Sequence, residues 1–282
     1  MPHPLPADPE AAERIRRRYA LERRLADRIR EAPAARRPTA VREAYDTFFR
    51  EAEPSPPDPA EVELQAAVLA PWIAPGTRLL DFGAGSGALA RRMAAGGAQV
   101  VALEASHELV ARARARGDEG LDGIRWLTVE EAEDGGLAPG SVDLAWSCHV
   151  VEHLHPDDLQ PHLRQLHHWL AAGGHALLAT PSRLWGPHDV SRYFDRRATG
   201  FHLREYTHGE LARSLSHAGF VEPRPLDLSG RPRPLASTAR TERLLGLLPP
   251  PVRALALQRL ARGGRPEPLR PLEQVLLVAR RL

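Results

Sequence analysis

The fold is decided by the stretch Leu79-Leu80-Asp81-Phe82-Gly83-Ala84-Gly85-Ser86-Gly87, which joins a short apolar run to a glycine-rich turn. The run Thr77–Phe82 has the length and composition of a buried strand, and Ser86–Ala95 continues it with a helical pattern. Glycine is needed in such a turn because the backbone must bend tightly and approach a ligand closely. The stretch therefore indicates an α/β protein that binds a ligand where this strand meets its helix.

Strand and helix patterns alternate on both sides of this turn, from residue 61 to residue 228. Further strands are predicted at Ala98–Glu104, Ile124–Val129, Ser141–Ser147, His175–Thr180 and Phe220–Leu228, with a last one at Glu273–Ala279. Helices are predicted at His107–Arg116, along Leu159, Leu163, Leu166 and Leu170 up to the turn Gly173-Gly174, and along Leu211, Leu215 and Ala218. This alternation predicts a doubly wound α/β fold with a mostly parallel sheet.

The two ends of the chain differ from this core. Residues 1–60 carry helical patterns at 9–31 and Val41–Glu51, followed by a linker at Pro54–Pro59, so we expect an N-terminal helical cap before a core of residues 61–282. Residues 229–271, rich in Pro and Arg, are expected to be irregular apart from one amphipathic helix at Val252–Leu260. We expect this insertion to form a lid or a dimer contact. Because Leu244–Leu260 mixes Leu with Arg, contact of this stretch with a membrane surface is the alternative.

Composition excludes several classes of protein. All 38 basic side chains are arginines, the net charge is +2, and the arginines are scattered, which argues against a nucleic-acid partner. No run approaches the roughly 18 apolar residues of a membrane helix, and the first residues lack the apolar stretch of a secretory signal. Cys148 is the only cysteine. We therefore expect a cytoplasmic protein without stable membrane insertion.

Of the two carboxylates beside the glycine turn, one discriminates between cofactors. Gly83, Gly85 and Ala88 also fit the dinucleotide pattern, but that turn normally holds a pyrophosphate where the helix field favours anions. Asp81 brings a carboxylate to the same crevice, which suits the cationic amino acid end of S-adenosylmethionine better. Glu104, 21 residues after Gly83, can accept hydrogen bonds from the ribose hydroxyls of either cofactor. S-adenosyl-L-methionine is thus the expected cofactor.

At this point the ordered motifs resemble those of class I S-adenosylmethionine-dependent methyltransferases. The matching motifs are Asp81-x-Gly83-x-Gly85-x-Gly87, Glu104, Glu131-Ala132-Glu133-Asp134, Val142-Asp143-Leu144-Ala145, Glu152-His153 and Gly173-Gly174. The chain is similar to the small-molecule type, such as the ubiquinone-biosynthesis O-methyltransferases, over residues 61–228 and the final strand. The resemblance implies a Rossmann-like, doubly wound α/β sheet of seven strands in the order 3-2-1-4-5-7-6, with the last strand antiparallel.

The resemblance also implies a role for each matching residue. Asp81, Gly83 and Gly85 would border the methionine part, Glu104 would hold the ribose, and Glu131 would face the adenine amino group. Ala132 would add a backbone contact there, and Ser147 and Cys148 would pass the sulfonium. The whole expected cofactor set is Asp81, Gly83, Ala84, Gly85, Gly87, Glu104, Ala105, Glu131, Ala132, Ser147 and Cys148. The family more often has Asp at position 131, so the adenine contact here depends on a longer side chain.

Histidines and aromatic side chains are the candidates for the acceptor side. We expect the general base among His149, His188 and His202, because histidine exchanges protons near neutral pH. Trp185, Arg192 and Tyr193 follow the fifth strand, and ligands of open α/β sheets bind beyond the carboxyl ends of the strands. Together with Tyr45, which we expect to reach inward from the cap, they form the expected substrate set.

The segment His149-Val150-Val151-Glu152-His153 has two further interpretations. It matches the H-x-x-E-H pattern of a zinc peptidase class, and some ubiquinone-subgroup relatives bind a divalent cation through E-x-x-E-H. His149 replaces the first glutamate of that second pattern, which weakens an oxygen-rich cation site. We expect no metal, and we expect Glu152 and His153 to orient the loop after the fourth strand.

The leading hypothesis for function is methyl transfer from S-adenosylmethionine to a hydroxyl or carboxyl group of a small molecule. N- and C-methylation by the same fold stay open. An NAD(P)-dependent oxidoreductase is a second hypothesis, against which Asp81 and the absence of any lysine for a Tyr-x-x-x-Lys pair both count. A catalytically silent subunit that binds a protein partner is a third, and a homodimer is left open.

Overall fold

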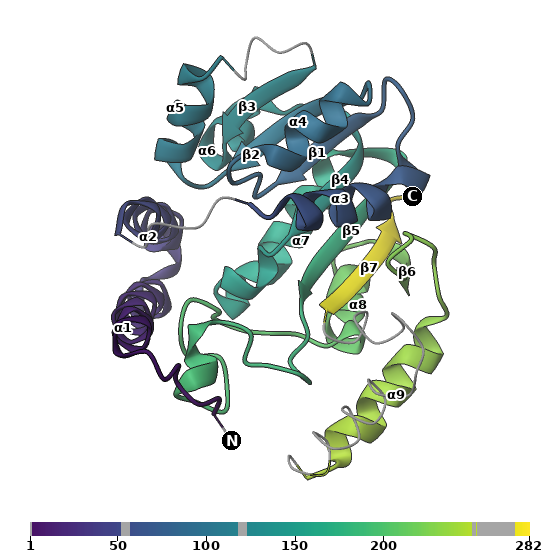
Figure 1. The fold of residues 1–282 in the computed structure, drawn as a ribbon. Coiled ribbons are helices and arrows are strands. Elements are labelled where there is room, and N and C mark those ends of the chain that lie inside the picture. Colours follow the sequence, from purple (N-terminus) through teal and green to yellow (C-terminus); the bar gives the residue numbers. More distant parts are fainter. Residues whose placement is uncertain (1, 52–56, 118–122, 250–251, 253–273) are drawn as a thin grey trace.

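A computed structural model of the chain describes residues 2–51, 57–117, 123–249, 252 and 274–282. Its centre is one seven-stranded sheet, seen obliquely in Figure 1. The strands are β1 (Arg78–Phe82), β2 (Gln99–Glu104), β3 (Ile124–Thr128), β4 (Val142–Cys148), β5 (Leu170–Pro181), β6 (Val221–Pro225) and β7 (Gln274–Arg280). They lie in the order β3-β2-β1-β4-β5-β7-β6, and β7 pairs antiparallel with both β5 and β6. The predicted fold class, strand order and antiparallel last strand are confirmed.

Helices cover both faces of this sheet. They are α1 (Pro9–Glu31), α2 (Arg37–Glu51), α3 (Pro59–Leu69), α4 (Ala88–Ala95), α5 (His107–Ala115), α6 (Val129–Glu131), α7 (Leu159–Trp169), α8 (His208–His217) and α9 (Leu235–Leu247). One hydrophobic cluster joins α7 and α8 to the sheet, and a second joins α3, α4 and α5 to it. Parallel strands covered on both faces are apolar throughout, and β1 accordingly is buried from Leu79 to Phe82.

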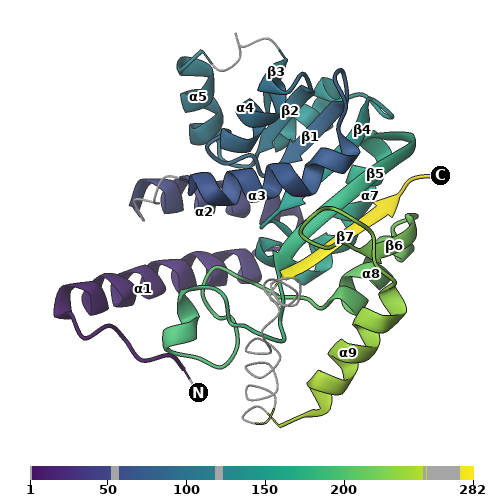
Figure 2. The same cartoon turned by 45° about the vertical axis from the view of Figure 1, so that its right-hand side comes forward.

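Helices α1 and α2 form a cap that packs beside the sheet (Figures 1 and 2). Helix α1 begins where the Asp8 side chain accepts hydrogen bonds from two backbone N–H groups, and Pro9 is its first residue. Leu25 and Ile29 are fully buried in a small separate core with Phe201. A bidentate ion pair at 2.7 Å joins Arg37 of the cap to Asp158, and fixes the cap to the core domain.

Three sequence predictions about the elements were wrong. The leucine helix ends at Trp169, because Leu170 already pairs with Val142 in the sheet, and Gly173-Gly174 lie inside β5. Helix α3 was not predicted, and α9 lies within a stretch predicted to be irregular. The weak amphipathic pattern of α9 hid it, although it buries Glu242 and Leu245.

Other predictions lie outside the described residues or stay untested. Most of the predicted helix at Val252–Leu260 and residues 54–56 of the linker lie outside the described residues. The division into cap, core and insertion, and a lid or dimer role for residues 229–271, stay predictions. Among the described residues, no helix is long and apolar enough to cross a membrane.

Replacement of Gly87 by alanine is expected to destabilise the fold by about 2–5 kcal/mol. Gly87 has φ +77° at the start of α4, and an added Cβ would lie 2.5 Å from the Trp126 ring, so backbone strain and overpacking both act. Gly135→Ala is the matched control. Its φ is +100° but nothing lies within 4 Å of the added Cβ, so backbone strain alone should cost about 1–2 kcal/mol. Urea unfolding measures both; equal losses would contradict the steric argument.

Candidate active site

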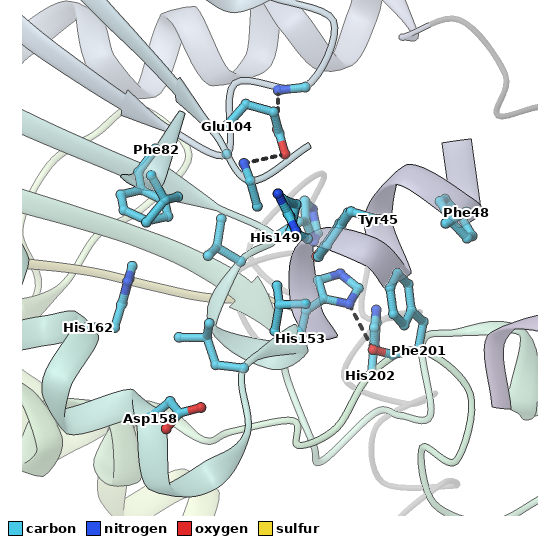
Figure 3. A pocket seen from close by; sticks show the side chains of 18 of the residues that line it. Tyr45, Phe48, Phe82, Glu104, His149, His153, Asp158, His162, Phe201 and His202 are labelled. Atoms are coloured by element: carbon cyan, nitrogen blue, oxygen red, sulfur yellow. Dashed lines mark hydrogen bonds between the residues drawn. The ribbon is translucent and has the colours of Figure 1, made fainter. Parts of the chain in front are cut away.

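A cavity of about 870 Å³ opens between the cap and the carboxyl ends of β1, β2 and β4. The expected residues that line it are Gly83, Gly85, Glu104, Ala105 and Cys148 for the cofactor, and Tyr45, His149, His188, Arg192, Tyr193 and His202 for the acceptor. Figure 3 shows Tyr45, His149 and His153 between Glu104 on one side and Phe201 and His202 on the other. The structure thus brings both expected sets to one cavity.

Glu104 organises the glycine turn. Its carboxylate accepts hydrogen bonds from the backbone N–H groups of Gly85 at 2.9 Å, Ala105 at 2.8 Å and Ser106 at 3.1 Å. Burial raises the pKa of Glu104, whereas these three donors lower it. A carboxylate so held at the end of β2 has further acceptor capacity for a diol in the cavity.

Asp81 lies directly beneath the turn and has an incomplete environment. It is 3% exposed, and its Oδ2 has no hydrogen-bond partner among the described residues. Burial, and then the nearby charge of Glu104, raise the pKa of Asp81 to about 7. A buried carboxylate without a partner is costly, so this position fits a cationic ligand group that would compensate it.

Several expected cofactor residues do not line the cavity. They are Asp81, Ala84, Gly87, Glu131, Ala132 and Ser147. Glu131 instead caps its own helix through Thr128 and forms an ion pair with Arg114 at 2.9 Å, which lowers its pKa. Ala132 is buried in the core. Glu130, in the one-turn helix α6, and Glu133, in the helical turn that follows it, line the cavity in its place. Nothing in the sequence revealed this arrangement.

Aromatic rings form one wall of the cavity, which we call the acceptor lobe and define by Tyr45, Phe48, Phe49 and Phe201. The Tyr45 ring centre lies 5.1 Å from that of Phe201 and 6.1 Å from that of Phe49, and Phe48 lies 5.3 Å from Phe201. Three of these rings come from α2 and one from the loop before α8. The sequence indicated Tyr45 but gave no reason to place Phe201 beside it.

A buried carboxylate, Glu152, lies beside this lobe. It is 0% exposed, and its two oxygens accept hydrogen bonds from His149 Nδ1 at 3.0 Å and from Thr180 Oγ1 at 2.9 Å. The His149 donor keeps the pKa of Glu152 low, at about 2, although burial alone would raise it. Ligand-capable atoms of Glu152, His153 and His202 lie within 4.8 Å of one another, close enough to share a proton or a cation.

The remaining expected residues after β5 take different places. His188 lines the cavity, and its Nε2 donates to the carbonyl of Ser182 at 3.1 Å. Trp185 does not line the cavity, and its indole nitrogen is buried without a partner among the described residues. Arg192 lies at the exposed rim, where it donates to the hydroxyl of Tyr193 at 3.2 Å.

Comparison with known proteins agrees with this fold. Residues 80–178, which hold β1 to most of β5, match the family described as a methyltransferase domain. A 110-residue stretch is 37% identical to the ubiquinone biosynthesis O-methyltransferase of Xanthomonas campestris pv. campestris, and covers 39% of this chain and 45% of that enzyme. The chain therefore spans less than half the length of the curated relatives it matches.

Solved structures show the same fold at low sequence identity. The 1,6-didemethyltoxoflavin N1-methyltransferase of Burkholderia thailandensis superposes with a TM-score of 0.53 at 18% identity, over 89% of this chain and 92% of that one. The phosphoethanolamine N-methyltransferase 2 of Haemonchus contortus does so with a TM-score of 0.53 at 18% identity, over 91% of this chain and 60% of that one.

The chain shares its fold with the solved methyltransferases above, and residues 80–178 within that fold match a methyltransferase domain. Its matched segment is similar to the ubiquinone biosynthesis O-methyltransferases.

Proposed function

We propose that this chain binds S-adenosylmethionine and transfers its methyl group to a hydroxyl group of a small aromatic molecule. The observation that carries this proposal is the single cavity in which the Glu104 turn, an aromatic wall and a set of partly buried histidines meet. When bound, S-adenosylmethionine supplies an electrophilic methyl group on a sulfonium whose leaving group is a neutral thioether.

The protein's own residues would bind, orient and deprotonate. Glu104 would accept the ribose hydroxyls, and Asp81 would oppose the ammonium group of the methionine part, which its unpartnered oxygen fits. The rings of the acceptor lobe would hold a planar acceptor, and alignment of this kind contributes on the order of 7 kcal/mol or more in ideal cases. A histidine would take the hydroxyl proton.

A hydroxyl acceptor is favoured over a carboxylate by the histidines at the centre of the cavity. Of the arginines that line the cavity, Arg18 and Arg37 are paired with Glu22 and Asp158 respectively, and Arg192 donates to the Tyr193 hydroxyl at the rim; Arg42 also lines it. Arg183 pairs with Glu210 instead of lining the cavity. Histidines, which suit removal of a proton, occupy its centre. The cap would exclude water from the reacting groups.

The acceptor group is tested with tritiated S-adenosylmethionine and three probes that share one ring system: 2-naphthol, 2-naphthoic acid and 2-naphthylamine. We expect label to be transferred to the naphthol at a rate at least about tenfold above the other two, because only the naphthol needs the histidine that the cavity supplies. Label that enters only the acid or only the amine would overturn O-methylation of a hydroxyl while leaving the methyl donor in place.

A further inference from the structure

Two histidine–carboxylate pairs meet in the cavity, and they differ in what surrounds the second ring nitrogen. His149 pairs with Glu152 and His202 pairs with Glu205. All four side chains are largely enclosed, with exposed fractions of 36% for His149, 0% for Glu152, 12% for His202 and 4% for Glu205. The inference drawn from this difference rests on the proposed function.

His149 is placed between carboxylates on both sides of its ring. Its Nδ1 lies 3.0 Å from Glu152, and its Nε2 lies 3.9 Å from an oxygen of Glu61, which comes from α3. The adjacent Cys148 sulfur and then Glu152 raise the pKa of His149 well above the usual value of 6.5, against the opposing effect of burial. The charge of a fully buried Glu152 needs a positive partner, and His149 as an imidazolium provides it.

His202 has one hydrogen-bonded carboxylate partner and lines the cavity. Its Nδ1 lies 2.9 Å from Glu205 Oε1, and because a carboxylate only accepts, the proton is on Nδ1 and the lone pair is on Nε2. Within the part of the chain that the structure describes, no hydrogen bond occupies that Nε2. The ring lies 4.9 Å from His153, next to Phe201 of the acceptor lobe (Figure 3).

Glu205 joins the two loops that carry the candidate histidines. The same Oε1 also accepts the backbone N–H of His188 at 2.8 Å. Gly186 lies against the carboxylate so closely that an added Cβ would be 1.9 Å from Oε2. Glu205 therefore fixes the orientation of His202 and the path of the segment after β5 at one buried point.

We propose that His202 is the general base of the reaction and that Glu205 is the positioning residue that fixes its Nδ1–H tautomer. The acceptor O–H bond breaks, and its proton goes to His202 Nε2. The oxygen forms the bond to the methyl carbon, and the electron pair of the broken S–C bond stays on the departing thioether sulfur. His149 stays protonated throughout, as the counter-ion of Glu152.

The charged and titratable groups around His202 determine the pH dependence. They are Glu205 on its own segment, Asp189 on the loop after β5, and Glu152 and His153 on the short helix after β4. Burial lowers the pKa of His202, but Glu205, then Glu152 and Asp189, raise it above 6.5 overall. Loss of the Glu205 charge should therefore lower it.

The test uses the full chain, labelled with ¹⁵N in its histidines and treated with a chelator, and follows the ring nitrogens by NMR against pH. In the wild type we expect His202 to show the Nδ1–H tautomer. In Glu205→Gln, an isosteric change, we expect its titration to move down by about one pH unit or more and the tautomers to mix. Glu205→Asp should restore the tautomer, and Glu222→Gln, at an exposed carboxylate, should change neither. An Nε2–H tautomer, or an unchanged titration in Glu205→Gln, would overturn the assignment.

A second measurement separates this inference from the proposed function. With 2-naphthol as acceptor, kcat for Glu205→Gln should fall at least tenfold, and the acid limb of the pH profile of kcat should move to lower pH. The affinity for S-adenosylmethionine should not change. If Glu152→Gln moves that limb and Glu205→Gln does not, His149 is the base and the inference is wrong while the function stands. If the wild type does not bind S-adenosylmethionine at all, the proposed function itself is refuted.

Discussion

Asp81→Asn is expected to weaken binding of S-adenosylmethionine strongly and, at the same time, to stabilise the cofactor-free protein above pH 7. Asparagine keeps the shape but removes the negative charge that would face the cofactor's ammonium group. Loss of one partner of a buried charge pair costs about 2–5 kcal/mol, which corresponds to a rise in the dissociation constant of roughly 30- to 5,000-fold.

The stability effect has a definite direction with pH. The pKa of Asp81 is raised from 3.8 to about 7, so the folded protein keeps a proton that the unfolded chain has lost between these pH values. The free energy of unfolding therefore falls as pH rises from about 4 to about 7. The difference between the two pKa values corresponds to about 4 kcal/mol at 1.36 kcal/mol per pH unit. Asp81→Asn removes this penalty.

Urea unfolding at pH 4 and pH 8, with calorimetric titration of S-adenosylmethionine, measures both effects. Asp134→Asn, at an exposed carboxylate of the same charge, is the matched control and should change neither. Normal cofactor binding in Asp81→Asn would show that Asp81 does not face the ligand. No gain of stability at pH 8 would show that burial does not penalise the charge of Asp81.

Glu104→Gln is expected to weaken cofactor binding by about 10²- to 10⁴-fold. Gly85 donates to one carboxylate oxygen and Ala105 and Ser106 donate to the other, so an amide nitrogen in place of either oxygen removes part of the contact that organises the glycine turn. The ribose loses a charged acceptor as well, and each hydrogen bond to a charged group contributes about 1.5–3 kcal/mol. Glu63→Gln, on the exposed face of α3, is the control. Titration of S-adenosylhomocysteine measures the loss; less than a threefold change would refute the role of Glu104.

The sequence predicted the sheet well because its strands are short apolar runs separated by turn residues. Thr77–Phe82 and Glu273–Ala279 were placed within one residue of β1 and β7. Helices α3 and α9 were missed for a physical reason. Helix α3 directly follows a proline-rich segment. Helix α9 has only a weak amphipathic pattern, and contact with α8 and β6 determines which of its residues are buried.

The site was predictable where a residue follows a strand and unpredictable where packing brings loops together. Gly83, Glu104 and His149 follow β1, β2 and β4, so the parallel sheet places them at one edge. Glu205 and Phe201 reach the cavity through a long irregular connection whose path is set by buried hydrogen bonds to Asp189 and Glu22. No local sequence signal encodes those contacts.

The central claim is that the cavity beneath the cap holds S-adenosylmethionine. Isothermal titration with S-adenosylmethionine, S-adenosylhomocysteine, NAD and NADP tests it most directly, because the same glycine turn fits either kind of nucleoside cofactor. The account predicts micromolar binding of the first two, lost in Asp81→Asn and Glu104→Gln, and no heat from the nicotinamide nucleotides. Binding of NAD or NADP, or binding of S-adenosylmethionine that survives both substitutions, would contradict it.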